Sequence, residues 1–341
     1  MLEGQEVTET PGATYSTPGP IDTPDRRDGS VYVPSNDVEL AVDVALATGR
    51  PLLLRGEPGS GKSSLAPWVA KRHNWRYYEH VVTSHTRAKD LLWTFDSVRR
   101  LADAQVLRTV RGRPSARYDA GSYVVPGPLW WAFAPRSAAA TAGAAARRGR
   151  TNRLRPARDR NQDRLQHCAV VLIDEIDKAD PDVPNGLLVP LASNEFFVTE
   201  TGTHVTVEPT TDGSPDAPRH LIVITTNDER MLPQAFLRRC VIAELKHPDS
   251  VSELVDIAKC HLEARLPAVQ QEDLDLATEV AKELQSLRSH LRPKGIRLPS
   301  TAEYLDALWA CRSLGIVPTA DDPRWKTLKG LTLVKRQQLG D

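Results

Sequence analysis

The sequence predicts an α/β fold, in which a parallel sheet carries helices on both faces, followed by a small all-helical region. A glycine-rich loop at residues 56–63 lies between a short apolar run and the start of a helix. Two further apolar runs, 169–173 and 221–224, each end in acidic or polar residues, as buried strands of an open parallel sheet do. After about His247 only helical spacing of apolar residues is found.

Composition limits the classes of function. The 341 residues suffice for one large or two smaller domains, and 44 basic side chains balance 44 acidic ones. Any affinity for nucleic acid must therefore be local. The four cysteines are scattered, which disfavours a disulfide framework or a zinc site and fits a reducing compartment. No leader peptide and no run of membrane-spanning length is found, so we expect a cytoplasmic protein without membrane contact.

The chain divides into three parts on this basis. Residues 1–29 are rich in Pro, Gly and Thr and predict a disordered tail. Residues 30–246 form the α/β domain, and residues 247–341 form the helical domain. A helix is expected from Asp37 to the stop at Gly49, just before the glycine-rich loop. This helix either walls a nucleotide base or simply packs on the sheet.

The glycine-rich loop is the strongest chemical signal. Its pattern is G-x-x-x-x-G-K-[ST] in a strand–loop–helix context, which predicts binding of a nucleoside triphosphate. Glycines let the backbone approach phosphate oxygens, and the following helix N-terminus favours anions. Lys62 is expected to reach the β- and γ-phosphates, and the Ser63 hydroxyl to ligate Mg²⁺. The expected nucleotide contacts are Gly56, Glu57, Pro58, Gly59, Ser60, Gly61, Lys62, Ser63 and Ser64.

The region between the loop and the next apolar run is less regular. It predicts a helix over 62–73, a strand over 75–83, one helix over 87–105 and a bulky helix near 129–133. Residues 135–166 then break the composition, with an alanine-rich piece and nine arginines. This basic insertion shows no apolar face that could reach a core. We expect it to be disordered; the alternative is binding to nucleic acid or to an acidic partner.

Two later strands end in residues suited to phosphate hydrolysis. The apolar run 169–173 leads into Asp174 and Glu175, at the carboxyl end of a strand where ligands bind in open α/β sheets. Asp174 is suited to hold Mg²⁺ and Glu175 to polarise the attacking water. Asn227 follows the run 221–226 and can bond the water or the γ-phosphate. The C-terminal helices include one that opens with a capping box at Ser300–Glu303.

These motifs, in this order, resemble those of the AAA+ ATPases, and within them the MoxR-like branch. Residues 56–63 match Walker A, 170–175 resemble Walker B, and Asn227 matches sensor 1. The segment 232–240 resembles the family's LPEAxLxRF segment, and Gly127-Pro128-Leu129 before the acidic pair resembles the order found in MoxR-like proteins. The resemblance implies a P-loop αβα sandwich with a helical lid domain, assembled as a homo-hexameric ring that binds ATP and Mg²⁺.

The same resemblance implies roles for three arginines. Arg239, with Arg238 as the second choice, is expected to reach the nucleotide of a neighbouring subunit. Where MoxR-like proteins have the sensor 2 arginine directly after a proline, this chain has Pro299-Ser300, and Arg297 is the nearest basic substitute.

The function expected from these features is Mg²⁺-dependent ATP hydrolysis that remodels or activates a protein partner. The resemblance implies a partner with a von Willebrand A domain. Two rivals stay open: a motor or loader directed to nucleic acid, and a slow, nucleotide-gated signalling scaffold. The sequence does not distinguish ATP from GTP.

Overall fold

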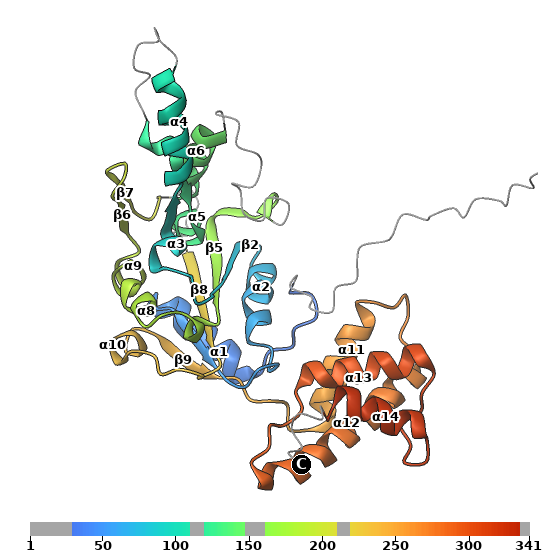
Figure 1. Cartoon of the computed structure of the whole chain (residues 1–341). Helices are drawn as coiled ribbons and strands as arrows, with labels where there is room; N and C mark the ends of the chain where they lie inside the picture. Colours follow the sequence, from blue (N-terminus) through green and yellow to red (C-terminus); the bar gives the residue numbers. More distant parts are fainter. Residues whose placement is uncertain (1–28, 110–118, 147–160, 210–218, 335–341) are drawn as a thin grey trace, which may run out of the picture.

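The computed structural model describes residues 29–109, 119–146, 161–209 and 219–334 (Figure 1). The tail predicted for residues 1–29 lies outside the described residues, except for Gly29. The described chain forms an α/β part and a separate group of helices, α11 to α14, at its side (Figure 1).

The central sheet has five strands in the order β2-β5-β8-β1-β9. Every neighbouring pair in it is parallel, as predicted. Leu53 pairs with Ile224 and Ile173 also pairs with Ile224, so the carboxyl ends of β1, β8 and β5 lie at one edge. The strands are β1 (Leu52–Arg55), β2 (Trp75–Val81), β5 (Leu165–Asp174), β8 (Arg219–Thr226) and β9 (Val241–Glu244).

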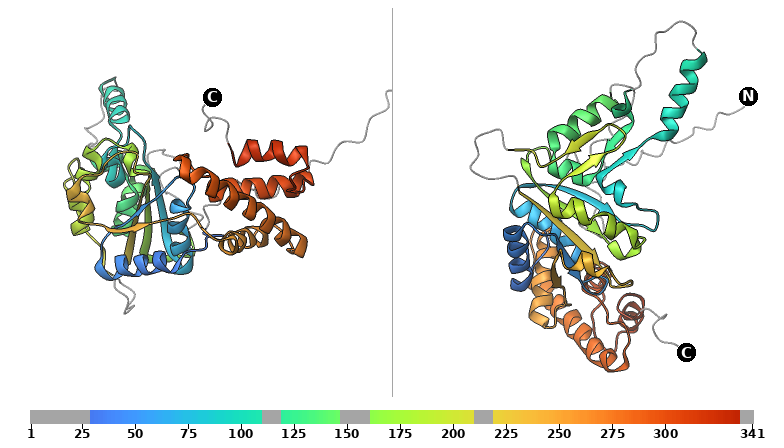
Figure 2. Two further views of the ribbon diagram at one scale, coloured as in Figure 1. Left: turned by 90° about the horizontal axis from the view of Figure 1, so that it is seen from below. Right: turned by 90° about the vertical axis from the view of Figure 1, so that its left-hand side faces the viewer.

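Helices cover both faces of this sheet, which confirms the predicted sandwich (Figures 1 and 2). Alternate residues of β1 show the two layers. Leu52 and Leu54 pack with apolar side chains of α1 (Asn36–Thr48) and α2 (Lys62–Arg72). Leu53 packs in the other layer, which includes α5 (Pro128–Phe133). Helix α1 ends at Gly49, whose left-handed φ of 64° caps it, as the sequence predicted.

The prediction of a single helix over 87–105 is wrong. The chain there forms α3 (Ala88–Leu92), β3 (Trp93–Phe95) and α4 (Ser97–Thr109). β3 pairs antiparallel with β4 (Val124–Pro126), which follows the short helix η1 (Ala120–Tyr123). Trp93 is buried and its ring stacks on Phe196 at a centroid distance of 5.6 Å. Pairing with a distant strand overrides the helical spacing that the local sequence shows.

The expectation that the basic insertion 135–166 is disordered is also wrong for its two ends. Residues Pro135–Ala146 form helix α6, in which Ala138, Ala142 and Ala145 are buried. Alanine favours the helix and its small side chain allows close packing, so these residues make an apolar face despite their low bulk. At the other end, Asn161 is buried and its amide makes two hydrogen bonds to the backbone of Tyr77, at 2.8 and 3.0 Å. Residues 147–160 lie outside the described residues.

Shorter elements complete the α/β part. η3 (Ile176–Lys178) follows β5 directly, and α8 (Asp182–Gly186) and α9 (Leu188–Ser193) follow η3. β6 (Phe196–Val198) and β7 (Thr203–Val205) form an antiparallel hairpin, and α10 (Gln234–Leu237) precedes β9. In both figures α4 projects from the α/β part at the end far from α11 to α14 (Figures 1 and 2).

The C-terminal helices have a core of their own, centred on Leu254, Val280, Leu284, Tyr304 and Leu308. They are α11 (Val251–Glu263), α12 (Gln271–Leu291), the short η4 (Arg292–Lys294), α13 (Thr301–Leu314) and α14 (Pro323–Thr332). We call them the lid. The predicted capping box at the start of α13 is confirmed: the Ser300 hydroxyl accepts from the Glu303 amide, and the Glu303 carboxylate accepts from the Ser300 amide. Within the described part of the chain, no helix is both long and apolar enough to cross a membrane.

Candidate nucleotide site

The glycine-rich loop follows β1 and leads into α2, as predicted. Gly59 has a φ of 79°, and a Cβ there would lie 2.6 Å from the Ser300 side chain of the lid. Lys62, at the first turn of α2, is buried, and its Nζ donates to the carbonyl oxygens of Gly56 and Glu57 at 2.7 and 2.8 Å. Burial lowers the pKa of Lys62, and the nearby Asp174 carboxylate opposes that shift. The loop therefore encloses a positive charge, which suits it to phosphate.

Asp174 joins the loop to the central strands. Its Oδ1 accepts hydrogen bonds from the Ser63 hydroxyl at 2.8 Å and from the Thr225 hydroxyl at 2.6 Å. Ser63 and Asp174 are thus adjacent, as the predicted Mg²⁺ site requires. Among the described residues, no group of three or more His, Cys, Asp or Glu side chains could hold a metal on its own. This donor set fits Mg²⁺, which protein sites commonly hold with one or two side chains and the phosphates of a nucleotide.

Glu175 and Asn227 also lie together, at the ends of β5 and β8. The Asn227 amide Nδ2 is 3.5 Å from Glu175 Oε1, and the Glu175 backbone N–H donates to the Thr225 hydroxyl at 2.8 Å. Glu175 has a φ of 61°, a left-handed conformation that is costly for a residue other than glycine. The local structure thus holds this carboxylate in a strained position at the carboxyl edge of the sheet. Its other oxygen, Oε2, accepts from Lys178 at 2.6 Å.

Asp177 is a site residue that the sequence did not reveal. Its carboxylate is buried, and Oδ2 accepts from the backbone N–H groups of Asn227 and Glu229, both at 3.0 Å. It therefore fixes the end of β8, where the Asn227 side chain begins. Thr225 is a second site residue that the sequence did not reveal. The pattern of a strand shows which residues are buried, but it does not show which hydroxyls face a neighbouring carboxylate.

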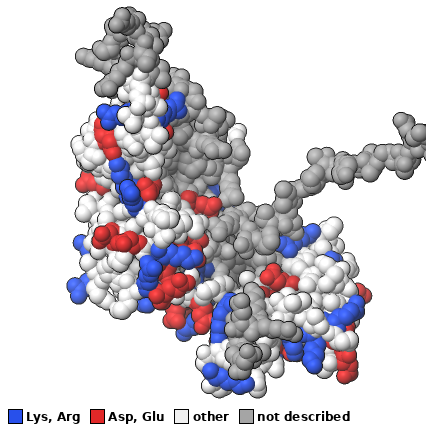
Figure 3. Space-filling model, viewed as in Figure 1, with Lys and Arg blue, Asp and Glu red and all other residues white. Residues whose placement is uncertain are grey.

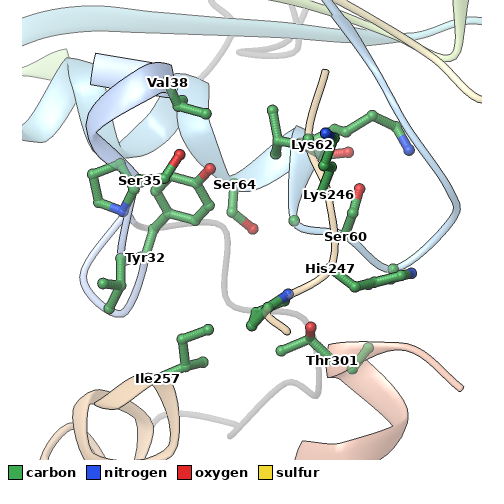
Figure 4. Close-up of a pocket in the computed structure, with 18 of the residues that line it drawn as sticks. Tyr32, Ser35, Val38, Ser60, Lys62, Ser64, Lys246, His247, Ile257 and Thr301 are labelled. Atoms are coloured by element: carbon green, nitrogen blue, oxygen red, sulfur yellow. The ribbon is translucent and has the colours of Figure 1, made fainter. Parts of the chain in front are cut away.

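A cavity of about 1320 Å³ lies between the glycine-rich loop, α1 and the lid (Figure 4). Its wall includes Lys62, Ser63, Asp174, Glu175 and Asn227, so the structure brings the predicted phosphate and metal residues to one space. Helix α1 contributes Val38 to this wall, and Val38 also belongs to the core beside the sheet. Helix α1 therefore packs on the sheet and also borders the cavity. That it walls a nucleotide base stays a prediction.

The cavity wall also includes residues that the sequence did not single out. Tyr32 lies beside the loop, 3.2 Å from where a Cβ on Gly61 would stand, and burial raises its pKa. His247 lies in the connection between β9 and α11 (Figure 4). Burial first, and then the Arg288 guanidinium, lower the pKa of His247, so its ring is neutral near pH 7. A pattern in a single sequence gives no signal for such residues, because their place at the cavity depends on the position of the lid relative to the α/β part.

The three arginines that were predicted to contact a nucleotide lie outside the cavity wall. Arg297 is absent from the cavity wall, and its Nη2 is 3.4 Å from the Glu303 carboxylate. Arg238 and Arg239 are exposed at the end of α10, also outside the wall. The Arg239 guanidinium donates to the Ala235 carbonyl at 2.9 Å. Within this single chain, none of the three arginines lines the cavity.

Comparison with known proteins agrees with the predicted fold. A family model described as AAA domain (dynein-related subfamily) matches residues 51–240, from the residue before β1 to the residue before β9. No curated protein matches the chain.

Solved structures of Thermotoga maritima RuvB give distant likenesses. A single-substitution variant of that protein is 15% identical with a TM-score of 0.40, covering 85% of this chain and 64% of the RuvB chain. A structure titled as the RuvB Holliday junction branch migration motor is 14% identical with a TM-score of 0.35, covering 81% of this chain and 66% of the RuvB chain. This chain therefore spans less than two thirds of the length of these RuvB chains.

Proposed function

Because this chain belongs to the AAA domain family, in its dynein-related subfamily, it is an ATPase that uses ATP with Mg²⁺, and we propose that it applies ATP hydrolysis to the remodelling or activation of a protein partner. Within the wider AAA+ group, the order of its motifs supports a MoxR-like assignment. The partner class that goes with this assignment is a protein with a von Willebrand A domain. The four free cysteines fit a cytoplasmic location.

The roles of the site residues in this proposal follow their positions. The loop amides and Lys62 bind the phosphates, and Ser63 with Asp174 holds the metal. Mg²⁺ neutralises charge on the phosphate oxygens when it is bound. Glu175 orients and polarises the attacking water, and Asn227 hydrogen-bonds that water or the γ-phosphate. Asp177 fixes Asn227 through the backbone.

The single observation that favours a protein partner is the exposure of three large apolar side chains at the end far from the lid. On α4, Val98 is 79% exposed and Leu101 is 62% exposed, and Phe197 of the β6–β7 hairpin is 53% exposed. These side chains stand on elements that project from the α/β part (Figure 1). Exposed apolar side chains on projecting elements indicate contact with another protein surface rather than with phosphates.

Assembly into a homo-hexameric ring is part of the proposal. Arg238 and Arg239 lie outside the cavity of their own chain and are exposed, so they are available to an adjacent subunit. A ring places the α10 end of one subunit beside the nucleotide of the next. The site would then be completed only in the assembly.

Nucleic acid is the weaker alternative. Of the nine arginines in residues 135–166, Arg136 pairs with Glu208 at 3.0 Å and Arg164 donates to the Trp75 carbonyl at 2.9 Å. The other seven lie outside the described residues. On the face shown in Figure 3, basic and acidic side chains of the described residues are interspersed, without a broad basic patch. Nucleic-acid binders usually gather Lys and Arg on one face.

The test traps the partner and then reconstitutes the effect. The Glu175→Gln variant, loaded with ATP, is used to capture bound proteins, with Lys62→Ala as the control that lacks bound nucleotide. The captured protein is purified and added to the wild type, and we expect it to change the ATPase rate at least about threefold. Phe197→Ser and Leu101→Ser should abolish this response but keep basal turnover, while Leu331→Ser, an equally exposed position on α14, should keep both.

Two results would overturn the proposal. One is a captured protein that leaves turnover unchanged. The other is strong stimulation by duplex or single-stranded DNA near 150 mM salt that disappears when the seven arginines between residues 147 and 160 are replaced by glutamine. That second result would put the nucleic-acid motor first.

A further inference from the structure

Three of the side chains on the wall of the nucleotide cavity have buried polar atoms without a hydrogen-bond partner among the described residues. They are the Ser60 hydroxyl, both ring nitrogens of His247 and the Thr301 hydroxyl. The His247 side chain is only 8% exposed; its Nε2 lies 3.3 Å from Glu57 Oε2, but not in the direction of a hydrogen bond. Buried polar groups are costly unless they bind a partner, so these groups indicate a ligand at this point of the cavity.

Thr301 is placed by the start of lid helix α13, which abuts the phosphate loop. Ser300 is the N-cap, and its side chain contacts the position that a Cβ on Gly59 would take. The Ser300 hydroxyl is already used in the capping box with Glu303. The Thr301 hydroxyl, one residue later, lines the cavity instead. The positive end of α13, a helix of 14 residues, thus faces the loop together with a hydroxyl donor.

His247 approaches the same place from the connection between the α/β part and the lid. It lies beside Glu57, and the Glu57 carbonyl accepts a hydrogen bond from Lys62 at 2.8 Å. His247 therefore stands on the Lys62 side of the loop, the side that serves the β- and γ-phosphates. Figure 4 shows the His247 ring between Ser60 of the loop and Thr301 of the lid.

We propose that Thr301 of the lid and His247 of the connection before it contact the terminal phosphate of ATP, in the place where the resemblance implied an arginine. Arg297, the sequence-based candidate, is turned to Glu303 and is not needed for it. The hydroxyl and the neutral imidazole each offer one hydrogen-bond donor to a phosphate oxygen. Because ADP lacks the terminal phosphate, this contact favours ATP over ADP. It also joins the lid to the phosphate loop. This inference rests on the proposed nucleotide site.

The test measures affinity rather than turnover. Isothermal titration calorimetry with Mg²⁺ compares the imido analogue of ATP with ADP for the wild type, Thr301→Val and His247→Phe. Each variant keeps side-chain volume and removes the donor. We expect each to bind the ATP analogue about tenfold more weakly and ADP less than about twofold more weakly. Thr278→Val is the matched control, because the Thr278 hydroxyl bonds the Leu274 carbonyl within α12.

The outcomes separate this inference from the proposed function. Equal losses for ATP analogue and ADP, or no loss in Thr301→Val, would overturn the assignment to the terminal phosphate. A wild type that binds neither nucleotide would instead overturn the nucleotide site itself. Thermal unfolding without nucleotide checks that each variant is folded, and if His247→Phe is not, Thr301→Val alone decides.

Discussion

Lys178 donates a hydrogen bond of 2.6 Å to the carboxylate of Glu175, three residues before it. The contact of Glu175 with Asn227 is longer, at 3.5 Å. The hydrogen bond to Glu175 raises the pKa of Lys178, so its ammonium group stays charged at every pH used for an assay. In the isolated chain, the proposed base is therefore held by a lysine rather than by the sensor asparagine.

The first prediction follows from this competition. Lys178→Met should raise basal kcat about two- to fivefold, because an exposed ion pair contributes up to about 1 kcal/mol and its loss frees Glu175 for the water. The ATP dissociation constant should not change. Lys282→Met is the matched control, since Lys282 makes a similar pair with Glu279 on α12, at 2.8 Å. A fall in kcat for Lys178→Met would mean instead that the lysine orients the base.

The second prediction separates binding from chemistry. Lys62→Ala should weaken ATP binding at least about tenfold, because a buried charge-assisted contact with phosphate is lost. Glu175→Gln should keep the affinity and lower kcat by about 10²- to 10⁴-fold, the usual contribution of a general base. Fluorescent ATP binding and phosphate release measure the two effects. Lys71→Ala, exposed on the same helix, is the control and should match the wild type.

Much of the fold could be predicted because its signals are local. The strand at 169–174 and the loop at 56–63 carry their own patterns, and the lid helices show helical spacing and a capping box. Asp174 and Asn227 could be brought together in advance because carboxyl ends of parallel strands share an edge. These parts needed no knowledge of distant contacts.

The parts that were missed depend on contacts between distant segments. β3 exists because Trp93 to Phe95 pair with residues 124–126, which local helical spacing cannot show. The face of α6 is made of alanines, whose burial follows from close packing and not from bulk. The roles of Asp177, His247 and Thr301 depend on which element lies opposite each side chain, and a single sequence carries no such information.

The third prediction concerns pH and stability. Burial lowers the pKa of His220 to about 4, from an ordinary value of 6.5. Between these values the unfolded chain binds a proton that the folded chain does not, so the free energy of unfolding falls as pH drops from about 6.5 to about 4. The loss attributable to His220 is up to about 3 kcal/mol.

The measurement compares wild type with His220→Phe in urea at several pH values. Phenylalanine does not titrate and can keep the ring contact with Phe133, whose centroid lies 4.9 Å from that of His220. The variant should show a flatter dependence of stability on pH below about 6.5 and little difference above it. His290→Phe, at an exposed position on α12, should leave the wild-type pH dependence in place. Parallel curves for wild type and His220→Phe would contradict the prediction.

The fourth prediction is that Arg239 completes the active site of a neighbouring subunit. In the single chain it donates to the Ala235 carbonyl, so it could equally serve only to cap α10. If it acts across the interface, Arg239→Ala should lower kcat by about 10³- to 10⁵-fold, as for arginines that stabilise the transition state of phosphoryl transfer. A helix cap alone would lower stability and leave kcat per folded site nearly unchanged.

Mixing two inactive variants decides between these roles. A subunit with Arg239→Ala keeps its own Glu175, and a Glu175→Gln neighbour can supply the missing arginine, so mixed assemblies should regain part of the activity. A site that uses its own Arg239 gains nothing from mixing, because every subunit then lacks one required group. Arg238→Ala is tested in the same way as the second candidate, and Arg219→Ala, exposed at the opposite end of β8 from Asn227, is the control. Absence of rescue in assemblies shown by native mass spectrometry to contain both variants would exclude the shared site.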